Sequence, residues 1–151
     1  MAKTIFIFCK RSTSSVLFTE LEHGIPIGTQ VIIVDTIGQL SYLYRYGSLA
    51  YIGGGFGKGI HNILEAATYG LPVIFGPSYQ KFSEAVELTR LGGAFPVQDE
   101  LEMLSTIRQQ FENPDLLKTS SRIAANYVTD KLGATSKILQ EVCKKTGANM
   151  L

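Results

Sequence analysis

The sequence predicts an α/β protein built on a doubly wound parallel sheet that closes with C-terminal helices. Three observations support this fold class. Short apolar runs alternate with helix-patterned segments between residues 31 and 111, which is the order that crossover connections give a parallel sheet. The apolar runs are nearly continuous, as in strands that are covered on both faces. The distinctive glycine and polar clusters follow these runs, where the ligands of such sheets bind.

The first segment of the chain predicts one buried strand and one ambiguous element. Residues 3–8 are mostly apolar and favour a strand. After a polar break, residues 16–21 form either a strand or a short helical turn, and we favour the strand. Glycine and proline at 24–28 predict a loop. Taken together, residues 1–28 are an atypical opening segment for such a sheet.

The middle of the chain predicts two strands with a helix between them. The run at 31–34 is wholly apolar and predicts a strand covered on both faces. Apolar residues at helical spacing then predict a helix over 38–46. The run at 49–52 predicts the second strand, which leads into a glycine loop.

The glycine loop precedes a helix and a further strand. Its glycines allow positive φ and let a ligand come close to backbone amides. Gly70 caps the helix and Pro72 ends it, ahead of a strand at 73–75. The residues expected to pack this helix against the sheet are Ile60, Ile63, Leu64 and Ala67.

The last third of the chain is predicted to be mostly helical. A helix over 81–91 precedes a short strand at 93–97, which Pro96 places near a sheet edge. Asp99 caps the next helix, Asn113 caps one that runs to about Asp130, and a last helix follows Gly133. The side chains expected to face inward are Phe82, Ala85, Val86, Thr89, then Leu101, Leu104, Ile107, Phe111, then Ile138 and Val142.

Length and composition limit the class of protein. With 151 residues the chain is predicted to form a single domain, and its net charge of +1 argues against a nucleic-acid partner. Cys9 and Cys143 form no metal-binding cluster with the two histidines, so we expect no metal and no cofactor. No apolar run is long enough for a secretion signal or a membrane span, which predicts a cytoplasmic chain.

The glycine loop suits an anionic ligand, and polar side chains stand directly behind it. His61, Asn62 and Glu65 stand at spacings of three and four, so a helix would place them on one face. Glycine amides with a helix N-terminus suit an anion such as phosphate. We interpret His61 as a helix-start residue rather than a catalyst. Lys58 and Lys81 either touch the phosphate or are solvated.

Four short motifs come in an order that is characteristic of one enzyme family. They are Asp35-Thr-Ile-Gly-Gln-Leu40, Gly53-Gly-Gly-Phe56, His61-Asn-Ile-Leu-Glu-Ala66 and Phe75-Gly-Pro77. With them the chain resembles the C-terminal, donor-binding domain of 3-deoxy-D-manno-octulosonic acid (Kdo) transferases. The resemblance implies a Rossmann-like fold, the C-terminal half of a GT-B glycosyltransferase. That family transfers Kdo from CMP-Kdo to the lipid A precursor in lipopolysaccharide biosynthesis, and needs no metal for the reaction.

The resemblance also implies which residues bind the donor. The turn at 35–38 would lie against the cytosine, with Asn62 and Glu65 holding the ribose and phosphate. The loop at 53–56 and the turn at 76–77 would line the pocket. The full set is Asp35, Thr36, Ile37, Gly38, Gly53, Gly54, Gly55, Phe56, His61, Asn62, Glu65, Gly76 and Pro77.

The chain also departs from the family pattern. Kdo transferases carry an N-terminal acceptor-binding domain with a membrane anchor and the general base, and nothing in the 151 residues corresponds to it. Gln39 stands where many members have Glu. We therefore expect a truncated nucleotide-sugar-binding domain with no catalytic residue of its own, inactive without that domain and reaching the lipid A precursor only through it. The parent enzyme would act at the cytoplasmic face of the bacterial inner membrane.

Other interpretations of the sequence stay open. One is a non-catalytic α/β nucleotide-binding or regulatory domain, and another is a fragment of a UDP-sugar GT-B transferase or epimerase. The glycines could serve only the turn between strand and helix, and Asp35 could be a turn former whose carboxylate bonds nearby amides. By comparison with the family pattern, residues 1–28 are a shortened entry without the first strand of the donor domain. A sheet that lacks an inner strand exposes an edge, so we also expect self-association through that edge.

Overall fold

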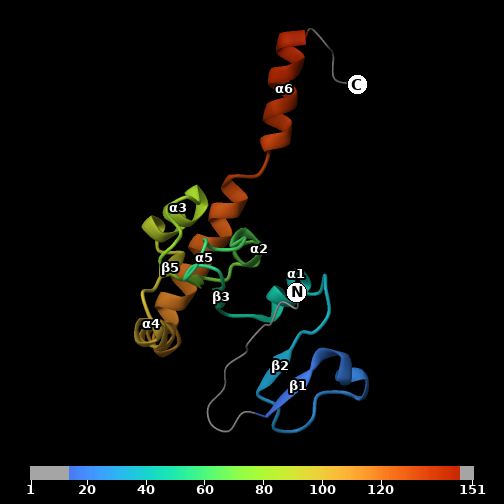
Figure 1. The fold of residues 1–151 in the computed structure, drawn as a ribbon. Helices are drawn as coiled ribbons and strands as arrows, with labels where there is room; N and C mark the ends of the chain where they lie inside the picture. Colours follow the sequence, from blue (N-terminus) through green and yellow to red (C-terminus); the bar gives the residue numbers. More distant parts are fainter. Residues whose placement is uncertain (1–13, 147–151) are drawn as a thin grey trace. The chain divides into compact units, whose positions relative to one another are not determined.

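The chain forms two compact units in a computed structural model that describes residues 14–146. The units are Met1–Gly47 and Ser48–Leu151 (Figure 1). The first contains a two-stranded parallel sheet and the second a three-stranded parallel sheet. The predicted α/β class with parallel strands is confirmed, with its strands paired in two sheets. The strand predicted at 3–8 lies outside the described residues.

The first unit is built on two short parallel strands. Its elements are β1 (Ser15–Leu17), a 3-10 helix η1 (Phe18–His23), β2 (Val31–Ile33), α1 (Leu40–Leu43) and a 3-10 helix η2 (Tyr44–Tyr46). The strand favoured at 16–21 is wrong beyond Leu17, where the alternative helical turn begins. Ile32 and Ile33 are only half-buried, so burial of β2 on both faces is also wrong. The faces of a strand are covered by helices, and the helices η1, α1 and η2 of this unit have only six, four and three residues.

The second unit places three parallel strands in the order β3-β4-β5. Its elements are β3 (Ala50–Ile52), α2 (Leu64–Ala67), β4 (Val73–Phe75), α3 (Ser83–Leu91), β5 (Ala94–Pro96), α4 (Glu100–Glu112), α5 (Pro114–Asp130) and α6 (Ala134–Thr146). The register pairs Ile52 with Phe75 and Phe75 with Pro96, so the three carboxyl ends are level. As Pro96 predicted, β5 lies at an end of this sheet.

The core of the second unit lies around β4 and α5. All three residues of β4 are fully buried between the neighbouring strands and the helices. Helices α2, α3 and α4 each contact α5, as Figure 1 shows. Of the four residues predicted to pack against the sheet, Ile60, Ile63 and Ala67 are buried and Leu64 is half-buried. This packing fixes the loops that follow β3 and β4.

Both predicted caps of the long helices are present. The Asp99 carboxylate accepts a hydrogen bond from the Glu102 amide at 2.8 Å, and Glu102 Oε2 accepts one from the Gln98 amide at 2.7 Å. Asn113 Oδ1 accepts a hydrogen bond from the Leu116 amide at 3.1 Å, ahead of a helix with proline at its first turn. These local interactions satisfy amides that a helix start leaves unpaired.

Several predicted inward-facing residues are exposed. On α3, Val86 is exposed while Leu88 is buried, and on α4, Leu101 and Phe111 are exposed while Gln110 is buried. At Gln110 and Phe111 the error is a rotation about the helix axis, because residues one position apart point about 100° away from each other. On α6, the predicted inward residues are also exposed, Ile138 by 62% and Val142 by 48%.

Candidate functional site

The glycine loop after β3 closes on itself. The amides of Gly57 and Gly59 donate to the Gly54 carbonyl at 2.9 and 3.3 Å, and the His61 amide donates to the Gly53 carbonyl at 3.1 Å. Gly54 and Gly59 have φ of +92° and +136°, values that residues with a side chain rarely adopt. The predicted use of glycine for positive φ is confirmed at these two positions.

A second use of glycine is the close contact between the loops after β3 and β4. A Cβ on Gly55 would lie 2.5 Å from the Gly76 nitrogen, and one on Gly76 would lie 2.6 Å from the Gly55 carbonyl carbon. The Ser78 amide donates to the Gly55 carbonyl at 2.9 Å. The structure therefore brings the predicted loop at 53–56 and the predicted turn at 76–77 together, backbone against backbone.

Asn62 and Glu65 meet at the start of α2. Asn62 Oδ1 accepts a hydrogen bond from the Leu64 amide at 3.0 Å, and its Nδ2 donates to Glu65 Oε1 at 3.2 Å. Because α2 begins at Leu64, His61 and Asn62 precede the helix, and the predicted helical face shared by all three residues is wrong. Glu65 is half-buried, and Asn62 fixes the direction of its carboxylate.

His61 and Phe56 also belong to the second unit, on the glycine loop and the segment that follows it. The His61 side chain is exposed, and its Cδ2 lies 3.3 Å from the Cβ position of Gly54. Phe56 is 55% exposed, and its Cδ2 lies 2.8 Å from the Cβ position of Gly76. The second unit therefore holds nine of the thirteen predicted site residues, in segments joined by hydrogen bonds and backbone contact.

The other four predicted site residues belong to the first unit. Asp35 Oδ1 accepts a hydrogen bond from the Thr19 amide at 3.2 Å, and Oδ2 accepts one from the Thr19 hydroxyl at 2.6 Å. The hydroxyl bond is the main cause that holds the pKa of Asp35 below its ordinary value of 3.8. Its carboxylate ties η1 to the end of β2. Next to it, Thr36 is half-buried, Ile37 is 89% exposed and Gly38 has φ of +90°.

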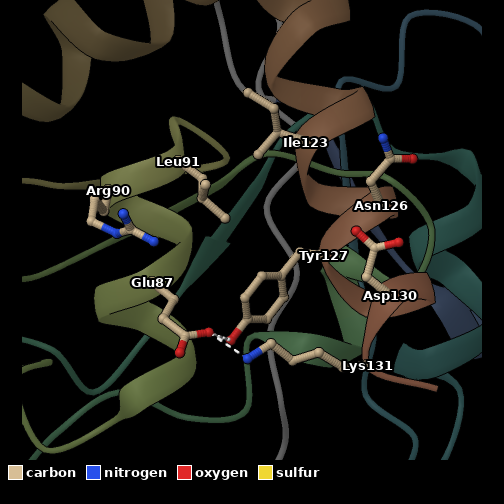
Figure 2. Close-up of a pocket in the computed structure, with 8 residues that line it drawn as sticks. All are labelled: Glu87, Arg90, Leu91, Ile123, Asn126, Tyr127, Asp130 and Lys131. Atoms are coloured by element: carbon tan, nitrogen blue, oxygen red, sulfur yellow. Dashed lines mark hydrogen bonds and ion pairs between the residues drawn. The ribbon is translucent and has the colours of Figure 1, made fainter. Parts of the chain in front are cut away.

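A polar cluster that the sequence did not reveal joins α3 to α5. Figure 2 shows Glu87 on α3 facing Tyr127 and Lys131 at the C-terminal end of α5. The Tyr127 hydroxyl donates to Glu87 Oε2 at 2.8 Å, Lys131 forms an ion pair with the same oxygen, and Lys131 Nζ lies 4.7 Å from the centre of the Tyr127 ring. The cluster borders a cavity of about 320 Å³ and contains no predicted site residue.

The charges of this cluster reinforce one another. The hydrogen bond from Lys131 is the main cause that lowers the pKa of Glu87, and the same bond raises the pKa of Lys131. Burial, followed by the bond to Glu87, raises the pKa of Tyr127. We interpret the cluster as a clamp between two helices.

Metal sites and membrane spans were predicted to be absent. Within residues 14–146, no three His, Cys, Asp or Glu side chains gather so that they could hold a metal ion. In the same part of the chain, no helix has the length and apolar composition needed to cross a membrane.

Comparison with known proteins finds relatives that are named as Kdo transferases. No family model matches the chain. It is 40% identical over 81 residues to the 3-deoxy-D-manno-octulosonic acid transferase of Aquifex aeolicus. The match covers 52% of this chain and 23% of the relative. The chain is 30% identical over 111 residues to that of Bordetella pertussis, covering 72% and 26%. It is 28% identical over 124 residues to the enzyme of the same name from Rickettsia prowazekii, and this match covers 80% of the chain and 26% of the relative.

A solved structure shares the fold. It is the C-terminal CMP-Kdo binding domain of WaaA from Acinetobacter baumannii, with a TM-score of 0.67 and 22% sequence identity over 76% of this chain and 60% of that one. The chain spans about a quarter of the length of the curated relatives it matches. The resemblance to Kdo transferases, and to the fold of their C-terminal domain, is confirmed.

Proposed function

We propose that this chain is the donor-binding part of a Kdo transferase and binds the CMP half of CMP-Kdo beyond the carboxyl ends of β3 and β4. The observation that carries this proposal is the association of three motif segments in one unit: the glycine loop packs on the turn at 76–77, and the segment with Asn62 and Glu65 is bonded to the loop through the Gly53 carbonyl. Crevices at this edge are where α/β sheets bind nucleotides.

The chemistry of the pair fits a ribose. Asn62 donates to one oxygen of the Glu65 carboxylate at 3.2 Å, which holds the group in one orientation. A carboxylate has about four acceptor positions, so it can accept hydrogen bonds from both ribose hydroxyls while it keeps the bond to Asn62. Charged acceptors form the stronger hydrogen bonds. Glu65 is therefore the residue on which nucleotide binding should depend most.

The remaining parts of the activity rest on the relatives. We propose that the whole protein transfers Kdo to the lipid A precursor at the cytoplasmic face of the bacterial inner membrane. No residue of this chain is assigned as general base or as an acceptor contact, so the single donor-binding domain should be inactive alone. An assay in which the purified chain transfers Kdo would contradict this division. Self-association through an exposed sheet edge is also proposed, and light scattering that shows only monomer would contradict it.

Isothermal titration of the purified chain with CMP and with UMP tests the proposal. We expect the chain to prefer CMP, and Glu65→Gln to weaken CMP binding by about 10- to 100-fold, which corresponds to a charged hydrogen bond of about 1.5–3 kcal/mol. The matched control is Glu112→Gln, because Glu112 is exposed at the far end of α4. Preference for UMP would support a UDP-sugar protein instead. No binding of either nucleotide would support a non-catalytic domain.

A further inference from the structure

A cavity of about 310 Å³ is lined by Pro77, one of the predicted donor residues, and otherwise by residues outside the predicted donor set. It opens between the glycine loop and the segment that joins β4 to α3, all within the second unit. The lining residues that matter below are Gly57, Lys58, Ser78, Gln80, Lys81 and Phe82. The cavity adjoins the predicted donor residues, since Gly57 follows Phe56 and Ser78 follows Pro77.

The walls of this cavity are held in place by contacts within the unit. The Ser78 amide is bonded to the Gly55 carbonyl at 2.9 Å, which fixes one wall to the other. The Phe82 ring packs on the backbone of Gly59, so that a Cβ there would lie 2.9 Å from Phe82 Cε2. The Phe82 amide donates to the Tyr79 carbonyl at 2.9 Å. The cavity is therefore formed before any ligand binds, which reduces the entropy cost of binding.

The charge in the cavity is positive. Its two charged lining residues, Lys58 and Lys81, are both exposed. In the part of the chain that the structure describes, the recorded ion pairs use Lys131 and Lys144, and none involves these two lysines. The nearest acidic residue in sequence is Glu84, in the first turn of α3, where its carboxylate accepts a hydrogen bond from the Ser83 hydroxyl at 3.4 Å.

The helix that borders the cavity adds to this potential. Helix α3 has nine residues, begins at Ser83 directly after the lining residue Phe82, and has no side-chain cap. The N-terminus of a helix carries partial positive charge. The Ser78 hydroxyl and the Gln80 amide are neutral groups that can bond sugar hydroxyls. A volume of about 310 Å³ is in the range of small-molecule sites and exceeds what a lone oxyanion needs.

We propose that this cavity is the subsite for the sugar acid of the donor, with Lys58 and Lys81 as contacts to its carboxylate. The inference rests on the proposed function, because a CMP-linked sugar acid carries one anionic group on the nucleotide and a second on the sugar. Asn62, Glu65 and the glycine loop hold the nucleotide. The lysine-lined cavity beside them holds the sugar.

Separate titrations of the purified chain with free Kdo, CMP and inorganic phosphate test the subsite by NMR. Lys58→Gln combined with Lys81→Gln should weaken Kdo binding by about 25-fold, at about fivefold for each charge, and should change CMP binding by less than about twofold. Glu65→Gln should weaken CMP binding and leave Kdo binding almost unchanged. Lys118→Gln combined with Lys145→Gln, two exposed residues on α5 and α6, is the control of equal charge change. Added salt should weaken Kdo binding to the unaltered chain more than to the double variant.

Each outcome decides the matter. Unchanged Kdo binding in the double variant overturns the subsite, even if CMP binding still depends on Glu65. Equal losses of CMP and Kdo binding assign the lysines to the phosphate and also overturn it. Inorganic phosphate that binds as tightly as Kdo and competes with it would show a general anion site, which overturns the sugar assignment. If the chain does not bind CMP but binds Kdo, and the double variant weakens Kdo binding, the subsite is supported. The proposed function would then be contradicted.

Discussion

Gly76→Ala should destabilise the second unit by about 1–3 kcal/mol, the usual cost of forcing an extra methyl into packed structure. The new Cβ would lie 2.6 Å from the Gly55 carbonyl carbon and 2.8 Å from the Phe56 nitrogen, both backbone atoms. Ordinary contacts are about 3.5–4.0 Å, so one of the two loops must move by roughly 1 Å. That movement would also strain the bond from the Ser78 amide to the Gly55 carbonyl, worth about 1 kcal/mol more.

The matched control is Gly53→Ala in the same loop. The nearest atom to a Cβ on Gly53 is His61 Cδ2 at 4.0 Å, and neither Gly53 nor Gly76 is among the glycines with positive φ. Without a clash or backbone strain, this change should be neutral or stabilise by up to about 1 kcal/mol, because alanine restricts the unfolded chain. The two variants therefore differ only in the space available to the methyl group.

Urea unfolding followed by circular dichroism measures both changes. With a slope of about 1–3 kcal/mol/M, a loss of about 2 kcal/mol lowers the midpoint by roughly 1 M. If Gly76→Ala and Gly53→Ala unfold at the same urea concentration, the two loops are not held backbone to backbone. The scaffold proposed for the nucleotide and for the sugar would then be refuted with it.

Three further changes test other parts of the structure. Gln110→Met should raise stability by about 1 kcal/mol or more, since Gln110 is 1% exposed and its Oε1 has no recorded partner within residues 14–146; a lower urea midpoint would contradict this. Thr19→Val should destabilise the first unit more at about pH 6 than at about pH 2. The lowered pKa of Asp35 gives stability that is present above pH 3.8 and is lost as the pH falls through the pKa of Asp35 in the folded chain. NMR-detected urea unfolding measures the change, and an equal effect at both pH values would refute this prediction. Tyr127→Phe removes the bond to Glu87 and should cost about 1 kcal/mol in the same urea assay, whereas an unchanged midpoint would show that the clamp adds nothing.

Features that depend on neighbouring residues could be predicted from the sequence. Asp99 and Asn113 accept hydrogen bonds from amides three residues ahead, and a cap followed by an apolar periodic segment is a local signal. The strands at β3, β4 and β5 were short apolar runs between turn residues, and they pair in parallel as expected. The four motifs predicted the resemblance that the relatives confirm.

Features that depend on packing between distant residues could not be predicted. Glu87 and Lys131 are 44 positions apart, and their ion pair exists only because α3 contacts α5. The same holds for Gly55 and Gly76, whose contact needs two adjacent strands of equal register. Burial of Gln110 instead of Phe111 depends on how α4 rotates against α5. The early end of β1 at Leu17 reflects the hydrogen bonds between Thr19 and Asp35.

The most direct test of the account is to map where CMP binds on the isotopically labelled chain by NMR. We predict that CMP shifts the amide signals of residues 53–56, 61–65 and 76–77, and that Glu65→Gln raises the CMP concentration needed for these shifts by about 10- to 100-fold while the spectrum stays folded. Shifts that appear instead around Glu87, Tyr127 and Lys131, or shifts at the loops that need no more CMP in Glu65→Gln, would contradict the proposed nucleotide site.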